Sequence, residues 1–155
     1  MLRFATIVLG CALLSACGTG QVRRVSEPAA NIQQLTVRAD GNWSVDVRLD
    51  NFSSIPMRFD SVGLALIVGG EAAGTLQGRP GLTIGPEAAD VATLAFTPSA
   101  SARIVVADAL ARGHDVAYSL EGTLDATPED GGQRHFRFHR SNRLSPVPGL
   151  PGVLR

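Results

Sequence analysis

Alternating apolar and polar residues between positions 43 and 50 give the clearest structural signal in the chain. The apolar residues occupy every second position and are Trp43, Val45, Val47 and Leu49. A period of two places them on one face of a β-strand, with the polar residues on the other face. This stretch therefore predicts a strand with one buried and one solvated face. We expect Trp43 to lie in the core or at one end of it, rather than to stack against a carbohydrate.

The residues before this strand predict its partner. Ile32, Leu35 and Val37 form a second, rougher apolar series, and Asp40-Gly41 lies between the two series. An Asp-Gly pair between two strand patterns is a strong tight-turn signal. We therefore expect the two strands to pair as an antiparallel hairpin.

Further strand patterns follow toward the C-terminus. Alternation over residues 57–68 changes phase at Asp60-Ser61, as a β-bulge would cause, and Gly69-Gly70 ends it. The other candidates are short or interrupted by glycine and lie at residues 73–76, 82–84, 91–96, 116–124 and 134–139. Together these patterns predict roughly seven or eight strands.

One segment has a helical period instead. Within residues 99–112, the apolar residues that share one predicted helical face are Ile104, Ala107, Leu110 and Ala111. Ser99 or Ser101 is expected to cap the start of this helix, and Gly113 is expected to close its end.

Short strands separated by turns, with one helix before the last pair, favour an all-β fold over alternating β and α units. We predict an immunoglobulin-like or fibronectin-III-like antiparallel β-sandwich of about seven strands with one inserted helix, formed by residues 31–143. Residues 144–155 contain Pro146, Pro148 and Pro151. They are expected to form an extended, disordered tail. The length predicts a single domain.

The N-terminus has the features of an export signal. A short basic region precedes an apolar run over residues 4–14, which is too short to span a bilayer. This run ends in Leu14-Ser15-Ala16-Cys17, which resembles the lipobox of bacterial lipoproteins. In that family the cysteine thiol receives diacylglycerol, the signal peptide is cut off before it, and the new N-terminus is acylated.

The lipobox resemblance implies a division of the N-terminal region. It implies a signal peptide at residues 1–16, lipidation of Cys17 and a lipidated tether at residues 17–30. Gly18 stands where Asp retains lipoproteins at the inner membrane, so the resemblance also implies an outer-membrane location facing the periplasm. Because Cys11 leaves with the signal peptide and Cys17 is lipidated, no thiol remains for a disulfide or a metal.

Charge is balanced along the chain, with 14 basic and 14 acidic residues, so composition implies no nucleic-acid partner. One local cluster of arginine and histidine occupies the last predicted strand and the residues after it, at 134–143. We expect this cluster to share the outer face of the strand and that face to be solvated. The alternative is contact with anionic lipid or another anionic partner through Arg134, Arg137, Arg140 and Arg143.

Candidate catalytic and metal-binding residues are few. His114-Asp115 could suggest a nucleophile triad, but no Gly-x-Ser-x-Gly motif accompanies it, and a solvated turn is the expected role. His135 and His139 have metal-ligand spacing for a helix, yet their alternation with phenylalanine predicts a strand. We therefore predict no catalytic residues, no cofactor, no metal and no enzymatic activity.

Turn and strand motifs follow one another in a specific order over residues 31–140. They are VRLDNF at 47–52, IP at 55–56, VGLALIVGG at 62–70 with Gly74 soon after, LTIGP at 82–86 and the strand at 91–97. This order resembles the late-embryogenesis-abundant (LEA) type 2 family, also called the water-stress and hypersensitive-response domain. The family's common Asn-Pro pair is replaced by Asn51-Phe52. The resemblance implies a seven-stranded sandwich with a helix and a non-enzymatic role in desiccation or other stress.

Two functions follow from these predictions. The first is a membrane-anchored envelope protein whose sandwich protects its neighbours under desiccation or osmotic stress. The alternative is a binding or adaptor module that engages an envelope protein or anionic lipid through sheet edges or the basic last strand. In both cases we expect attachment to the membrane through the lipid anchor and no nucleic-acid partner.

Overall fold

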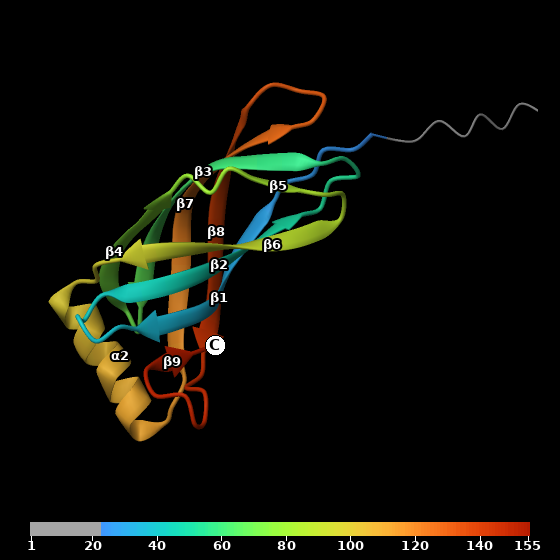
Figure 1. The fold of residues 1–155 in the computed structure, drawn as a ribbon. Helices are drawn as coiled ribbons and strands as arrows, with labels where there is room; N and C mark the ends of the chain where they lie inside the picture. The colour runs from blue at the N-terminus through green and yellow to red at the C-terminus, as the bar shows by residue number, and fades with distance from the viewer. Residues whose placement is uncertain (1–22) are drawn as a thin grey trace, which may run out of the picture.

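The computed structural model describes residues 23–155. The predicted signal peptide, Cys17 and the first part of the predicted tether lie outside the described residues. The elements of the described part are β1 (Ala29–Val37), β2 (Trp43–Asn51), β3 (Met57–Val68), β4 (Glu71–Gly78), β5 (Leu82–Ile84), β6 (Ala88–Phe96), α2 (Ala100–Arg112), β7 (Val116–Pro128), β8 (Arg134–Leu144) and β9 (Val153–Leu154) (Figure 1). Within residues 23–155, no helix has the length and apolar character needed to cross a membrane.

The strands form two antiparallel sheets. One sheet has the order β6-β2-β1-β9, and the other has the order β4-β3-β7-β8 with β5 also paired to β3. This arrangement confirms the predicted all-β sandwich with one inserted helix. The helix α2 lies at one end of the sandwich, and the described chain begins at the opposite end (Figure 1). We call these the helix end and the tether end.

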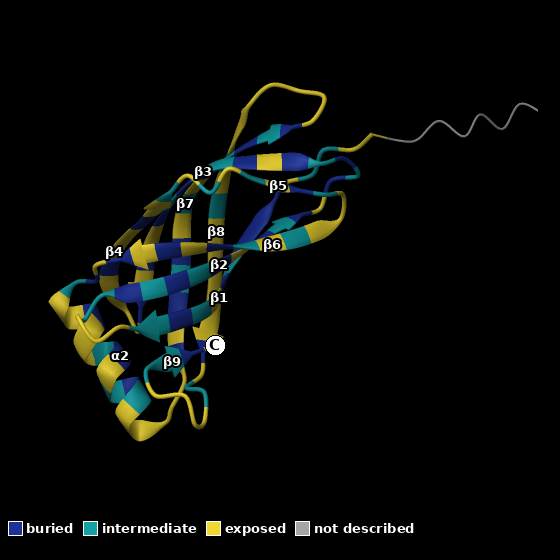
Figure 2. Cartoon of the chain, in the orientation of Figure 1, coloured by how far each residue is buried: buried dark blue, intermediate teal, exposed yellow. Residues whose placement is uncertain are grey.

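The core lies between the two sheets and is built from the inward positions of each strand (Figure 2). The alternating residues of β2 are buried as predicted. Trp43 packs against Phe96 of β6, with ring centroids 6.0 Å apart and the rings tilted by 53°. An aromatic pair in this geometry adds to the free energy gained by burying its area. The core position predicted for Trp43 is therefore confirmed.

The predicted hairpin is also confirmed. β1 and β2 pair antiparallel up to Val37 opposite Trp43. Gly41 in the turn has a φ of 80°, a conformation that glycine adopts without the steric cost of a Cβ. A register shift between Ile32 and Gln34 explains why the apolar series of β1 is rougher than that of β2.

The long strand β3 shows the predicted change of phase and the predicted end. Its register against β7 shifts between Phe59 and Ser61, as a bulge requires. Gly69 and Gly70 then turn the chain into β4 with φ values of 57° and 87°. Both features of this strand are therefore confirmed.

The helix α2 has the predicted caps but buries a different face. The side chain of Ser99 accepts a hydrogen bond from the backbone N–H of Ala102, and Gly113 closes the helix with a φ of 67°. The buried residues are Ala102, Val106 and Ala109, whereas Ile104 is 70 % exposed. The predicted face of Ile104, Ala107, Leu110 and Ala111 is therefore wrong. Most residues of this helix are apolar, so periodicity cannot choose a face, and the small alanines allow the closest approach to the sheets.

The C-terminal residues 144–155 fold back onto the sandwich, so the predicted disordered tail is wrong. Leu154 in β9 pairs with Leu35 of β1 and is fully buried. Ser145 and Arg155 exchange backbone hydrogen bonds of 2.6 and 2.9 Å that close the proline-rich loop between them. Burial of Leu144 and Leu154 holds this loop in place. A strand of two residues is too short to show a period in the sequence.

Candidate functional site

The tether end contains the two polar residues that are buried in the described part of the chain, Asn51 and Ser53. The side-chain amide of Asn51 donates hydrogen bonds to the backbone oxygens of Ile55, Ile84 and Gly85, at 2.9, 3.1 and 2.9 Å. Its oxygen accepts one from the backbone N–H of Ser53 at 2.9 Å. Asn51 thus joins the β2–β3 turn to the end of β5.

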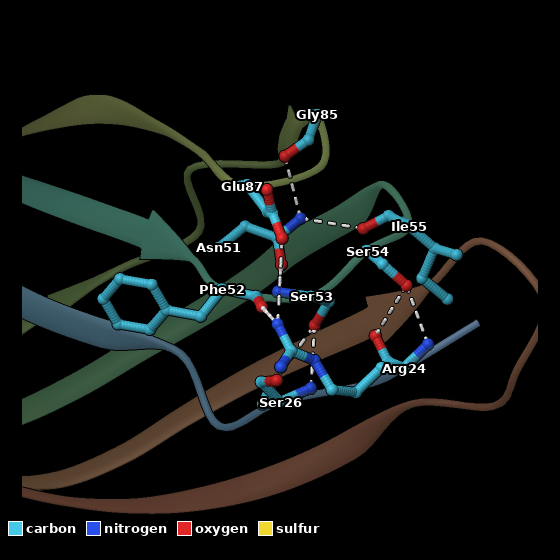
Figure 3. A network of polar contacts seen from close by, with 9 residues as sticks. All are labelled: Arg24, Ser26, Asn51, Phe52, Ser53, Ser54, Ile55, Gly85 and Glu87. Carbon is cyan, nitrogen blue, oxygen red and sulfur yellow. Dashed lines mark hydrogen bonds and ion pairs between the residues drawn. The ribbon is translucent and has the colours of Figure 1, made fainter. Parts of the chain in front are cut away.

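The same turn holds the chain that leads into the domain (Figure 3). The hydroxyl of Ser53 accepts a hydrogen bond from the backbone N–H of Ser26 at 3.0 Å, and Ser54 accepts one from that of Arg24 at 2.8 Å. The backbone N–H of Ser54 donates in return to the carbonyl oxygen of Arg24 at 3.0 Å. We call Arg24, Ser26, Asn51, Ser53 and Ser54 the tether clamp.

The tether clamp revises the predicted boundary between tether and domain. Residues 24–26, expected to belong to the tether at 17–30, are hydrogen-bonded to the β2–β3 turn, and β1 begins at Ala29 rather than after residue 30. Arg24 and Ser26 were not predicted as part of the domain because the segment before β1 has no periodicity, and no role was predicted for Ser53 and Ser54 in the turn after β2. The Ser53-Ser54 pair beside the Asn51 motif was the one local signal of side chains able to hold a backbone.

Phe52 lies within the clamp but points away from it (Figure 3). Its neighbours Asn51 and Ser53 are fully buried, whereas Phe52 is 51 % exposed. Its carbonyl oxygen accepts a hydrogen bond of 3.2 Å from the Arg24 guanidinium. The turn is therefore held on its polar side, while its aromatic ring lies on the side away from Arg24 and is half exposed (Figure 3).

The predicted basic cluster does not form a single face. Arg137 of β8 stands opposite Thr123 of β7 on the outer face, whereas Arg140 stands opposite the buried Leu120. Arg140 donates a hydrogen bond of 3.0 Å to the side chain of Asn31 in β1, across the sandwich. Strand neighbours an odd number of residues apart point to opposite faces. Expecting the cluster to share one outer face was therefore wrong.

The division of the arginines follows the pleat of β8. Arg134 and Arg140 belong to the side of this strand that faces the other sheet, and Arg137 and Arg143 belong to the outer side. All four are exposed because β8 is an edge strand. A partner could therefore meet two of these four arginines on either face, half of the predicted cluster.

Acidic residues of β7 accompany the histidines on the outer face. His135 Nδ1 lies 2.7 Å from Asp125 Oδ1, and His139 stands opposite Glu121 in the strand register. Hydrogen bonds from Ser61 and then from His135 hold the pKa of Asp125 below its usual value. Negative charge on β7 therefore offsets part of the positive charge on β8.

Ser61, Asp125 and His135 are the three residue types of a hydrolase triad, but their order differs. The Ser61 hydroxyl donates to Asp125 Oδ2 at 2.6 Å, and His135 contacts the other oxygen of the same carboxylate. In a triad the imidazole lies between the hydroxyl and the carboxylate and takes the hydroxyl proton. Here the carboxylate lies in the middle, so His135 cannot act as the base for Ser61 in this arrangement.

The other residues considered for chemistry lie apart from this group. His114 is in the exposed turn after α2, where its Nε2 lies 3.6 Å from Asp108 Oδ2. This position agrees with the predicted solvated turn. Within residues 23–155, the structure brings no three His, Cys, Asp or Glu side chains into a cluster that could hold a metal ion.

The helix end carries an apolar groove of about 690 Å³ between α2 and the C-terminal loop. It is lined by Leu110 on the helix, by Val147 and Leu150 on the loop, and otherwise by alanine, proline and glycine. Leu150 is partly exposed at its rim.

No family model and no curated protein matches the chain. The solution structure of AT1g01470 from Arabidopsis thaliana is 13 % identical in sequence, with a TM-score of 0.50 over 81 % of this chain and 82 % of that one. A crystal structure of a protein from Archaeoglobus fulgidus is 12 % identical, with a TM-score of 0.45 over 80 % of this chain and 98 % of that one. The X-ray structure of Northeast Structural Genomics Consortium target SoR45 is 13 % identical, with a TM-score of 0.49 over 82 % of this chain and 92 % of that one.

These similarities concern the fold alone. The likeness to the Arabidopsis structure is compatible with the resemblance to the LEA type 2 family that the sequence motifs indicate.

Proposed function

We propose that this chain is a non-enzymatic, lipid-anchored envelope protein whose sandwich protects its neighbours at the membrane during desiccation or osmotic stress. The lipobox at Cys17 supports the anchor, and the order of the sequence motifs supports the protective role. The compatible fold supports the second point at the level of architecture. The membrane is most simply the outer one, facing the periplasm, because Gly18 follows the lipidated cysteine.

The observation that carries this proposal is the tether clamp. It holds the chain from Arg24 onward against the domain, so only six residues, 18–23, separate Cys17 from the clamp. A fully extended chain advances about 3.5 Å per residue, so the distance from Cys17 to Arg24 is at most about 25 Å. A domain anchored through Cys17 therefore works next to the membrane surface rather than at a distance from it.

Substitution of the lipobox cysteine tests the anchor. Cys17→Ser should block lipidation and leave the protein unprocessed or released from membranes, because serine offers no thiol for the diacylglycerol. Cys11→Ser is the matched control, since Cys11 precedes the cleavage site and should be dispensable. Mass spectrometry of the mature N-terminus decides the result. An unmodified Cys17, or a mature chain that starts elsewhere, contradicts the anchor.

Drying experiments test the protective role. Cells that lack the protein should survive osmotic shock and drying less well, and the purified domain should preserve the activity of a drying-sensitive enzyme. Arg137→Glu combined with Arg143→Glu should protect as well as the wild type, because exposed charges contribute little to folding. Equal survival with and without the protein, together with no preserved activity, contradicts this role.

The β8 strand favours a second candidate function, that of a binding module. This strand of 11 residues pairs with β7 on one side and forms the edge of its sheet, and exposed edges can accept a strand from a partner. The double reversal of Arg137 and Arg143 separates the candidates. If the outer face binds an anionic partner, binding should weaken in this variant and in wild type as salt rises. Salt-sensitive binding that the variant loses would favour the binding module.

A further inference from the structure

The Phe52 side chain takes no part in the hydrogen bonds that hold its turn, and it is 51 % exposed. The turn around it is held by the buried side chains of Asn51 and Ser53 and by a hydrogen bond from Arg24 to the Phe52 carbonyl oxygen. None of these contacts uses the phenyl ring, which points away from the polar network (Figure 3). The clamp therefore presents an aromatic ring on a rigid turn.

The position of Phe52 distinguishes it from the other exposed large apolar residues. Ile104 and Leu150 line or flank grooves beside α2, and Ile67 is near the end of β3 that leads to Gly69 and the helix end. Phe52 alone among the large exposed apolar residues of the described chain lies at the tether end. The carbonyl oxygen of its turn is hydrogen-bonded to Arg24, so the turn lies beside the segment that leads to Cys17, while the ring lies on the side away from Arg24 (Figure 3).

Arg23 and Arg24, at the tether end, each lie near a carboxylate. Arg23 forms an ion pair with Asp130, and Arg24 approaches Glu87 with a separation of 3.8 Å. Each of these arginines is thus accompanied by a carboxylate at the same end of the molecule. A contact made here depends on the phenyl ring and on its distance from the anchor, rather than on attraction to anionic headgroups.

We propose that Phe52 contacts the membrane that holds the Cys17 anchor, with its ring in the interfacial layer of the bilayer. Phenylalanine is among the apolar side chains that interfacial segments bury at the boundary between headgroups and acyl chains, and the short span between Cys17 and Arg23 brings the turn within reach of this boundary. This inference rests on the proposed function. The anchor and Phe52 then form two points of attachment on the tether-end half of the sandwich.

Tryptophan fluorescence of the full, lipidated protein in vesicles tests the contact. Phe52→Trp places a reporter in the turn, and Ile104→Trp places one at an exposed position at the helix end as the matched control. The native Trp43 is present in both variants, and its burial in the core makes the wild-type spectrum the baseline to subtract. The vesicles contain neutral lipid, with or without bromine atoms near the headgroup end of the acyl chains.

The expected result is a shift of the Phe52→Trp emission to shorter wavelength and a loss of that emission in brominated vesicles. Neither change should occur for Ile104→Trp, and raising the salt concentration should not reverse the loss. Mass spectrometry of the same samples reports the lipid on Cys17. Absence of lipid contradicts the proposed function, whereas a lipidated chain without quenching at position 52 overturns the membrane contact alone. Equal quenching at positions 52 and 104 also overturns it.

Discussion

The two ends of the sandwich are secured by different kinds of contact. At the tether end, the buried amide of Asn51 and hydroxyl of Ser53 hold two turns and the incoming chain through hydrogen bonds. At the helix end, α2 and the C-terminal loop are held mainly by buried apolar residues such as Val106 and Leu154. The tether end is thus specified by directional contacts and the helix end by packing.

The two ends therefore offer different contact surfaces to a partner. Hydrogen bonds fix the turn at the tether end in one geometry, so a single exposed ring there keeps its direction. Packing at the helix end leaves apolar surface uncovered on α2 and the groove beside it. A rigid point contact is therefore expected at the tether end, and a broader apolar contact surface is available at the helix end.

Removing the amide at the tether end should give the largest loss of stability. Asn51→Leu retains the side-chain volume but leaves three backbone oxygens without their donor, which should lower the free energy of unfolding by about 3 kcal/mol. Chemical denaturation measures this change. Asn142→Leu, at an exposed position in β8, is the matched control and should have a small effect. Equal losses in the two variants would mean that the clamp does not stabilise the fold.

Truncating the apolar anchor of the C-terminal loop should cost somewhat less. Leu154→Ala removes buried side-chain volume, and we expect a loss of about 2 kcal/mol, the low end for a buried leucine, because the loop can partly collapse. Hydrogen exchange should increase first at the backbone N–H of Arg155 and Val147, which close the loop. Leu150→Ala, at the groove rim, is the control. Unchanged exchange in Leu154→Ala would show that this end does not depend on packing.

Weakening the attachment of the incoming chain should have a smaller effect on the whole fold. Ser53→Ala removes the acceptor for the Ser26 backbone N–H and should lower stability by about 1 kcal/mol. Hydrogen exchange gives the more specific test, because exchange of the Ser26 backbone N–H should become faster while exchange in β2 and β3 stays slow. Ser141→Ala in the exposed part of β8 should change neither. A uniform rise in hydrogen exchange across both sheets would show that the clamp does not act only on the incoming chain.

Replacing Asp125 should have the smallest of these effects, a change in how the melting temperature depends on pH at acid pH. The folded protein holds the pKa of Asp125 below the ordinary value of 3.8, chiefly through the Ser61 hydrogen bond. Because its pKa is lowered by folding, the ionised Asp125 carboxylate stabilises the fold at pH values above its ordinary pKa. This stabilisation is lost as the pH falls toward and past the lowered pKa of the folded protein. The melting temperature should therefore fall less between neutral pH and pH values below 3.8 in Asp125→Asn than in wild type. Equal falls would contradict the role of this carboxylate.

Several features could be predicted from local patterns alone. The alternation of β2, the Asp40-Gly41 hairpin turn and the bulge near Asp60 depend on residues that are close in sequence, and each is confirmed. The split of the arginines in β8 was also within reach of the sequence. Arg134 and Arg137 are three residues apart, so a strand must place them on opposite faces.

The sequence by itself determined the class of the fold, the faces of the strands and the caps of the helix, because periodicity and turn chemistry act over a few neighbouring residues. Only the tertiary structure decided which face of α2 is buried, that the proline-rich end returns to the core, and that residues 24–26 join the domain. These outcomes depend on contacts between distant segments, such as Ser26 with Ser53, which are 27 positions apart. The free energy of such contacts exists only once the sheets have brought both partners together.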